Sequence, residues 1–337
     1  MKKQTILFLD NTYPQAYQLS TLQQQAIGGT EASVVRTALI LSSSFNVIVA
    51  QKFRQKITHE NETLVFIPKN EMQLYKPDFV VVLRKFPLLK QLVLMFPNAK
   101  LFLWLHTYKG YEYVFKRQGL SQTHTTIICN SDFHRKDVNR LLNKTVLAKF
   151  YSMFTKNIKV NYCYNPIFKP IDKNSKRDLN KLLFFSSPNK GLKQVIESFN
   201  FINTKLPKLK LYIANPGYKT DLSIQHNENI IYLGSLPYKE MMKHVKQSLC
   251  VFYVQDSFSE TFGLIYAEAN ALGTPVLAHD LGSAREILDQ NNPIIDVNNY
   301  QEIIETITSW QKDFPKVTYN ENFSEKNILK QWGKLLV

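Results

Sequence analysis

The sequence predicts an α/β protein built from two Rossmann-like domains with parallel sheets. Strand-like apolar runs alternate with helix-like segments along the chain, which is the pattern of parallel sheets covered by helices. The runs are almost continuously apolar, as expected for strands that are buried on both faces. The stretch IDKNSKRDLN (171–180) is polar and lacks periodicity, so we interpret it as a linker between two such series. With 337 residues, the chain is long enough to form two separate cores.

The first series of strands runs from TILFLD to VNYCYN. Strands are expected at 5–10, 46–50, 63–68, 78–84, 101–106, 125–131 and 160–165. Helices are expected at about 31–41 and 132–142, and Gly28-Gly29 forms a turn before the first of them. Residues 1–165 are therefore assigned to an N-terminal domain.

The second series repeats the scheme after the linker. Strands are expected at 181–187, 209–215, 229–235, 249–255, 275–279 and 293–297. Helices are expected at 192–202, about 261–273, about 300–312 and 324–336, and the last two have apolar faces that include Trp310 and Trp332. Residues 166–320 are therefore assigned to a C-terminal domain.

The net charge of +15 is unevenly distributed. Residues 1–165 hold 22 Lys and Arg against 9 Asp and Glu, whereas residues 166–337 hold 20 against 18. A basic excess of this size can bind an anionic membrane surface, an acidic acceptor or nucleic acid. A solvated, lysine-rich surface accounts for the same composition equally well.

The cysteines and the apolar runs indicate the compartment. Cys129, Cys163 and Cys250 lie far apart without a C-x-x-C pair or a His cluster, so neither a disulfide framework nor a zinc site is indicated. The run 6–9 is too short for a signal peptide, and no stretch approaches the length of a membrane span. We expect a cytoplasmic protein that is able to associate with the inner face of the membrane.

The stretch DSFSETFGLIYAEANALGTPVLAH (256–279) holds the best candidate site. Glu260 and Glu268 have seven residues between them, and a helix is expected to begin near Thr261. This places Glu260 at the helix mouth, where N–H groups and the dipole favour phosphate or sugar oxygens. Gly263 would let a ligand approach the backbone, and Glu268, about two turns inside, could accept hydrogen bonds from ribose hydroxyls. By themselves, two acids at this spacing more often cap a helix or form an ion pair.

The residues around Glu260 and Glu268 favour a ligand site over a helix cap or an ion pair. Glu260 is followed by Thr-Phe-Gly, and Glu268 lies in Ala-Glu-Ala, followed by Gly-Thr-Pro-Val (273–276) and Gly-Ser-Ala-Arg-Glu (282–286). This order resembles the E-x7-E segment of the family-four retaining glycosyltransferases. The resemblance implies the GT-B fold, in which two Rossmann-like domains face each other across a cleft, with a final helix (321–337) that crosses back to the N-terminal domain.

Two further segments of the first domain resemble positions of that family. Gly28-Gly29-Thr30-Glu31 resembles a Gly-Gly-x-Glu loop that faces the donor diphosphate, although a plain turn with Thr30 as helix cap is the simpler interpretation. It is not the G-x-G-x-x-G of dinucleotide dehydrogenases. His106 ends an apolar run, where a lone His is usually structural. The resemblance implies that His106 contacts the transferred sugar.

Lys190 lies in the loop before the first helix of the second domain. Its ammonium could neutralise a diphosphate, although it could equally be an exposed loop lysine. The family usually has an Arg five residues earlier, and this sequence has Phe185 there. Ser186, Ser187 and backbone N–H groups, or a basic residue such as Lys193, would have to replace it.

The remaining matches are architectural. Asn130-Ser131 and Asn165-Pro166 resemble a serine position and the hinge, and Leu236-Pro237 lies where the nucleotide base would bind. No Asp-x-Asp occurs in the sequence, so no metal is indicated, and helix dipoles with Lys190 would have to stabilise the diphosphate.

The resemblance implies a retaining, metal-independent hexosyltransferase without a cofactor, acting in glycolipid, lipopolysaccharide or polysaccharide synthesis. It moves a sugar from a nucleoside-diphosphate donor, UDP more often than GDP, to a sugar or glycolipid acceptor. The expected catalytic residues are His106, Lys190 and Glu260. The expected donor-binding residues are Gly28, Gly29, Ser187, Lys190, Leu236, Glu260, Thr261, Phe262, Gly263, Leu264 and Glu268.

Two alternatives remain at this point. A sugar-nucleotide 2-epimerase shares the architecture but needs additional acids and a His for elimination. A non-catalytic basic protein could bind nucleic acid or membrane. The sequence has no RNA-binding motif or stacking platform, so nucleic acid is not an expected partner.

Overall fold

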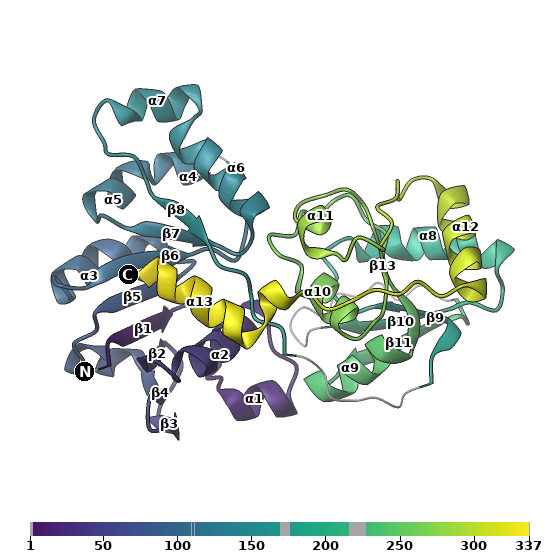
Figure 1. Ribbon diagram of the computed structural model, residues 1–337, viewed down its shortest axis with the longest axis horizontal. Coiled ribbons are helices and arrows are strands. Elements are labelled where there is room, and N and C mark those ends of the chain that lie inside the picture. The colour runs from purple at the N-terminus through teal and green to yellow at the C-terminus, as the bar shows by residue number, and fades with distance from the viewer. Residues whose placement is uncertain (1–2, 109, 111, 169–175, 216–226, 337) are drawn as a thin grey trace. The chain divides into compact units, whose positions relative to one another are not determined.

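The computed structural model describes residues 3–108, 110, 112–168, 176–215 and 227–336, and it divides into two compact units (Figure 1). The first unit contains Met1–Leu19, Thr30–Pro166 and Glu325–Val337, and the second contains Ser20–Gly29 and Ile167–Ser324. Each unit has its own mainly parallel sheet. The predicted α/β class with two Rossmann-like parallel sheets is confirmed.

In the described residues, the first unit holds an eight-stranded sheet in the order β3-β4-β2-β1-β5-β6-β7-β8. All its neighbouring pairs are parallel except β3 with β4. The strands are β1 (Thr5–Asp10), β2 (Asn46–Gln51), β3 (Thr58–Asn61), β4 (Leu64–Pro68), β5 (Phe79–Leu83), β6 (Lys100–Trp104), β7 (Thr126–Cys129) and β8 (Val160–Tyr162). Because β1, β5, β6 and β7 are adjacent and parallel, the residues that follow them share one edge of the sheet.

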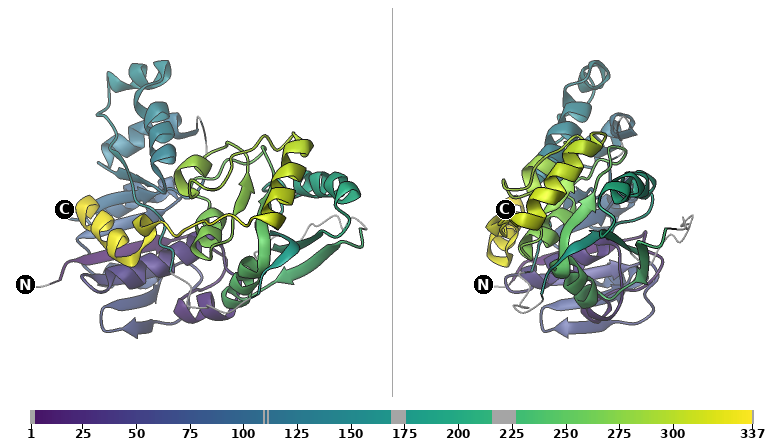
Figure 2. Two further views of the ribbon diagram at one scale, coloured as in Figure 1. Left: turned by 45° about the vertical axis from the view of Figure 1, so that its right-hand side comes forward. Right: turned by 90° about the vertical axis from the view of Figure 1, so that its right-hand side faces the viewer.

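Helices cover this sheet on both faces. They are α2 (Gly29–Leu41), α3 (Leu89–Met95), α4 (Glu112–Phe115), α5 (Arg117–Gln122), α6 (Asp132–Asn143), α7 (Val146–Ser152) and α13 (Glu325–Leu336), with the 3₁₀ turns Lys69–Leu74 and Phe86–Leu88. The C-terminal helix α13 lies along this sheet in both figures that show the whole chain (Figures 1 and 2). Trp332 on α13 is fully buried and makes edge contacts with Phe8 and Trp104, with ring centroids 5.6 and 5.1 Å apart. These contacts fix α13 to the first unit.

In the described residues, the second unit holds a five-stranded, all-parallel sheet in the order β11-β10-β9-β12-β13. Its strands are β9 (Asp178–Phe184), β10 (Lys210–Asn215), β11 (Ile230–Ser235), β12 (Ser248–Tyr253) and β13 (Val276–Ala278). Its helices are α8 (Leu192–Lys205), α9 (Tyr238–Gln247), α10 (Leu264–Ala271), α11 (Ala284–Ile287) and α12 (Tyr300–Lys312), with a 3₁₀ turn at Glu321–Phe323; the short helix α1 (Leu19–Gln24) lies mostly in this unit.

The structure differs from the prediction at three places. The run 293–297 is not a strand and contributes only a bridge from Ile294 to Ala278. Strand β3 was not predicted, because its sequence Thr-His-Glu-Asn is polar and it lies at the sheet edge. The predicted linker is also too long, since β9 already begins at Asp178, and its residues 171–175 lie outside the described residues.

Every helix among the described residues is too short or too polar to span a lipid bilayer.

Candidate functional site

An ion pair between Lys190 and Glu260 forms the centre of the candidate site in the second unit. Lys190 follows β9 and Glu260 follows β12, and these strands are parallel neighbours, so both residues come from the same edge of the sheet. Lys190 Nζ lies 2.8 and 3.0 Å from the two carboxylate oxygens of Glu260. The Glu260 side chain is only 8% exposed, whereas that of Lys190 is 27% exposed. The ammonium is therefore the more accessible partner of the pair.

Two tyrosines complete the surroundings of the Glu260 carboxylate. The Tyr253 hydroxyl donates a hydrogen bond to Glu260 Oε1 at 2.9 Å. Burial and then the charge of Glu260 raise the pKa of Tyr253 well above its usual value, and the same two causes raise the pKa of Tyr266. Both phenols therefore remain neutral at physiological pH.

The backbone at Glu260 is held by a glycine turn. Gly282 has a φ of 66°, and a Cβ there would lie 2.6 Å from the Glu260 carbonyl oxygen. The next residue, Ser283, donates its N–H to that same oxygen at 3.1 Å. Only glycine fits this close approach at a left-handed φ. This explains why Gly-Ser at 282–283 accompanies the Glu260 segment in the sequence.

The helix after Glu260 begins later than predicted. α10 starts at Leu264, because Gly263 adopts a left-handed conformation with φ 74° and becomes the N-cap. The predicted start at Thr261 is therefore wrong, and Glu260 lies in the loop before the helix rather than at its mouth. Glu268 is the fifth residue of α10, little more than one turn inside, and it is buried.

Within the described residues, the N-terminus of α10 has no side-chain cap. Its N-cap residue, Gly263, has no side chain that could accept a hydrogen bond from the first turn. A Cβ on Gly263 would come within 2.3 Å of the Tyr266 ring. Phe262 is buried against Phe323, with ring centroids 5.1 Å apart. The chain therefore enters α10 with the Gly263 backbone close to the Tyr266 ring.

The Gly28-Gly29 loop belongs to the same compact unit. Gly28 is buried, and a Cβ on Gly29 would lie 2.8 Å from Leu264 Cδ1, so the loop approaches the start of α10. Helix α2 begins at Gly29, which places Thr30 in its first turn. The prediction that Thr30 caps this helix is therefore wrong.

Other predicted residues have partners outside the ion pair, although the Ser187 carbonyl accepts the Lys190 N–H at 2.9 Å. Ser187 is buried and its hydroxyl donates to Asn189 Oδ1 at 2.5 Å. Lys193 is highly exposed and pairs with Glu197 on α8 at 3.8 Å, so it does not replace the absent arginine. Leu236 follows β11, two strands away from β9.

A second polar cluster occupies the carboxyl edge of the first unit's sheet. Asp10 ends β1, and Arg84 directly follows β5 with an unusual φ of 59°. Arg84 Nη2 lies 2.8 Å from Glu31 Oε1 on α2 and 3.9 Å from Asp10 Oδ1. The buried Tyr17 donates its hydroxyl to Asp10 Oδ2 at 2.9 Å. A left-handed arginine at a strand end is strained, so the surrounding contacts must hold it there.

In this cluster the Arg84 guanidinium lies beside two carboxyl groups, those of Asp10 and Glu31. Burial raises the pKa of Glu31, although the charge of Arg84 opposes the shift. Asp10, Tyr17 and Arg84 were not among the predicted site residues. Asp10 and Arg84 could have been found, because both are polar residues at the carboxyl end of an apolar strand, which is the same signal that identified His106.

His106 lies at this same edge, two residues after β6. Trp104 Nε1 donates to Asn130 Oδ1 at 2.7 Å, which directs the Asn130 amide nitrogen to His106 Nδ1, 3.3 Å away. His106 Nδ1 is therefore an acceptor and the ring proton is on Nε2. Burial lowers the pKa of His106 well below its usual value, and the charges of Arg84 and His134 act in the same direction. His106 is thus a neutral hydrogen-bond donor.

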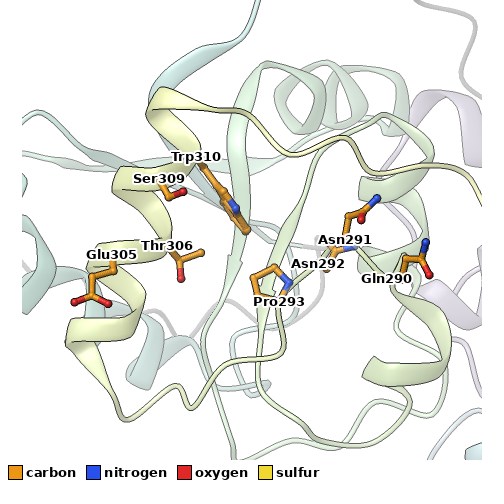
Figure 3. Close-up of a pocket in the computed structure, with 8 residues that line it drawn as sticks. All are labelled: Gln290, Asn291, Asn292, Pro293, Glu305, Thr306, Ser309 and Trp310. Carbon is orange, nitrogen blue, oxygen red and sulfur yellow. The ribbon is translucent and has the colours of Figure 1, made fainter.

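The second unit also has a pocket of about 550 Å³ beside α12 (Figure 3). Its lining residues are Gln290, Asn291, Asn292, Pro293, Glu305, Thr306, Ser309 and Trp310. Figure 3 shows Trp310 and Thr306 on the helix opposite Pro293 on the loop. None of the predicted site residues lines this pocket.

The second half of the chain is similar to a known protein family. Residues 169–328, which include Lys190, Glu260 and Glu268, match the family model of the glycosyl transferases group 1. An uncharacterized glycosyltransferase of Methanocaldococcus jannaschii is 30% identical over 175 residues, which cover 45% of this chain and 48% of that protein. The alpha-monoglucosyldiacylglycerol synthase of Streptococcus pneumoniae is 32% identical over 99 residues, which cover 28% of this chain and 22% of that protein. The matches thus span about half or less of these relatives.

Similarity to solved structures extends over the whole chain. Anabaena HepE, solved in complex with UDP and glucose, superposes with a TM-score of 0.66 at 14% identity and with 99% of each chain covered. At this identity the likeness shows the fold alone. The chain therefore has the GT-B fold, and its residues 169–328 match the family model of the glycosyl transferases group 1.

Proposed function

We propose that the protein is a retaining glycosyltransferase that moves a sugar from a nucleoside-diphosphate donor to an acceptor hydroxyl. The observation that carries this proposal is the Lys190–Glu260 pair, which lies at the carboxyl edge of the sheet within a group 1 glycosyl transferase domain. Ligands bind at this edge in parallel α/β sheets.

Each member of the pair has a separate role in the proposal. The more exposed Lys190 ammonium binds the donor diphosphate and stabilises the charge that develops as it leaves. The Glu260 carboxylate, held by Tyr253, accepts hydrogen bonds from hydroxyls of the transferred sugar. Thr261, Phe262, Gly263 and Leu264 supply backbone N–H groups to sugar and phosphate, and Glu268 holds the ribose.

The remaining donor contacts are proposed by position. Gly28 and Gly29 let the diphosphate approach the backbone, Ser187 offers a hydroxyl to it, and Leu236 packs against the base. His106 donates from Nε2 to a hydroxyl of the transferred sugar.

The chemical step needs no protein nucleophile in this proposal. The bond between the sugar C1 and the diphosphate oxygen breaks while the acceptor oxygen bonds to C1 from the same face. The acceptor proton passes to the departing phosphate. Lys190 and the start of α10 stabilise this leaving group without a metal, so activity should persist in a chelator.

The known relatives support the choice of substrates. HepE was solved with UDP and glucose, which favours UDP as the nucleotide. A curated relative is a synthase named for a glucosyldiacylglycerol, which favours a glycolipid acceptor. Together with the basic first half, this supports an enzyme that acts at the inner face of an anionic membrane.

A panel of sugar nucleotides tests the proposal. We expect one donor to be consumed with release of nucleoside diphosphate when an acceptor extract is added, and the product should keep the donor's anomeric configuration. Conversion of the donor without an acceptor would instead indicate an epimerase. Release of nucleoside diphosphate from none of the donors would contradict the proposed function.

A further inference from the structure

Helix α7 and the turn that follows it expose a continuous apolar surface on the first unit. This surface, which we name the α7 stripe, consists of Val146, Leu147, Phe150, Met153 and Phe154. These side chains are between 38 and 88% exposed. Grouped exposed apolar residues in a water-soluble domain usually mark an interaction surface.

The spacing of the α7 stripe is that of one helix face. At 3.6 residues per turn, the five positions fall within an arc of about 120°. The opposite face contains Ala148, which is fully buried, and Tyr151, which packs against the core of the unit. α7 therefore has its small residue towards the protein and its large apolar residues towards the outside, the reverse of an ordinary surface helix.

The base of this element is held rigidly. The buried guanidinium of Arg117 donates hydrogen bonds to the Leu142 carbonyl and to Asn143 Oδ1 before α7. It also donates to Thr155 Oγ1 at 2.9 Å and to the Lys156 carbonyl at 3.2 Å after it. Both ends of the segment are thus tied to one buried cation. The exposed stripe is consequently a preformed feature of the fold.

Positive charge surrounds the α7 stripe. From Val138 to Ile171 the sequence contains no Asp or Glu. The exposed basic residues described in this stretch are Arg140, which pairs with Asp137, and Lys144, Lys149, Lys156 and Lys159. Figure 1 shows α7 at the outer end of the part of the first unit that also holds α6, and the views in Figure 2 agree. Such a surface matches the layers of an anionic bilayer: the apolar side chains can contact the acyl chains while the surrounding lysines contact the lipid phosphates.

We propose that the α7 stripe inserts into the surface of an anionic membrane while the surrounding lysines bind lipid phosphates. A second copy of the chain fits this surface poorly, because it would bring the lysines of two stripes together. The inference rests on that part of the proposed function that places the acceptor at a membrane, but it does not depend on the donor chemistry. Vesicle binding without any donor therefore tests it separately.

Vesicle flotation of the full chain tests the proposal. We compare vesicles of phosphatidylcholine alone with vesicles of equal parts phosphatidylcholine and phosphatidylglycerol. The double variant Phe150→Ser/Phe154→Ser should lose about tenfold in affinity for the anionic vesicles. The matched control Leu74→Ser/Leu94→Ser removes two leucines elsewhere in the same unit that are at least as exposed on average, and it should bind like the parent. Equal melting temperatures would show that the variants are folded.

A fluorescence readout locates the contact. Tryptophan emission should shift to shorter wavelength on addition of anionic vesicles for Phe154→Trp, and it should not shift for Leu94→Trp. Equal binding of the parent to neutral and anionic vesicles would overturn the proposal, as would unchanged binding of the Phe150→Ser/Phe154→Ser variant. A concentration-dependent dimer that this variant abolishes, without vesicle binding by the parent, would assign the stripe to self-association instead.

Discussion

The Glu260 carboxylate accepts hydrogen bonds from an ammonium and a phenol, and its charge orients both of them. Glu260→Gln keeps the size of the side chain and removes the charge. We expect the kcat of transfer to fall by about a hundredfold, because a preorganised charge at the reacting sugar is lost. The donor KM should change by less than about threefold.

Steady-state kinetics check this expectation. Glu197→Gln is the matched control, since Glu197 belongs to the same unit and pairs with the exposed Lys193. An unchanged kcat in Glu260→Gln would remove Glu260 from the proposed reaction.

Arg84 combines backbone strain with charge balance. Arg84→Ala leaves Asp10 and Glu31 without their cation and should lower the free energy of unfolding by about 3 kcal/mol at neutral pH. Because burial already raises the pKa of Glu31, this loss should shrink as the pH falls and Glu31 binds a proton. Arg84→Gly removes the same charge but relieves the φ of 59°, so it should be about 1 kcal/mol more stable than Arg84→Ala.

Urea unfolding of both variants between neutral and acidic pH measures these differences. Equal stability of the alanine and glycine variants would show that the backbone at Arg84 carries no strain.

At the scale of elements, the start of α10 depends on Gly263. Gly263→Ala would place a methyl group 2.3 Å from the Tyr266 ring at a φ of 74°. We expect a loss of about 2 kcal/mol in unfolding free energy and weaker donor binding, because the turn into α10 must shift. Gly333→Ala on α13 is the control, since a Cβ there meets open space, and it should be neutral or stabilising. Thermal melting and donor titration of both variants test this, and equal melting temperatures would contradict it.

Helix α6 carries a buried histidine that should make the protein sensitive to acid. Burial lowers the pKa of His134 from 6.5 to about 4, although Asp137 opposes the shift. Between these values the unfolded chain binds the proton more tightly, so stability is lost as the pH falls from about 6.5 towards 4, by about 3 kcal/mol in total. His134→Gln should remove this dependence, whereas His59→Gln, which changes an exposed histidine, should retain it. Parallel pH slopes of unfolding for both variants would contradict this account.

At the scale of the whole molecule, the fold class and most of the elements could be predicted from the sequence. Strand β1 lies at Thr5–Asp10 and helix α12 at Tyr300–Lys312, as the apolar periodicity predicted. The predicted strand 101–106 was too long because its last two residues lie beyond β6. Hydrophobicity continues past the last paired residue at this edge of the sheet, so periodicity alone cannot locate the strand end.

Only part of the candidate site could be predicted from the sequence. The predicted residues Lys190 and Glu260 lie in contact, although 70 positions separate them. The turn at Gly263 was missed because a left-handed glycine and a helical residue do not differ in apolar pattern. Arg84 follows an apolar strand and could have been found by that signal, but its partner Glu31 lies 53 positions away, and Tyr17 lies in a loop with no such signal.

The most direct test of the account is donor binding by the Glu260–Glu268 segment. Calorimetric titration of the parent and of Glu268→Gln with UDP-sugars measures it, with Glu197→Gln as the control. We predict that one UDP-sugar binds the parent and the control with equal affinity, and that Glu268→Gln binds it about tenfold more weakly, because the ribose loses a charged acceptor. Equal affinity of Glu268→Gln and the parent, or no binding of any nucleotide sugar to the parent, would contradict the account.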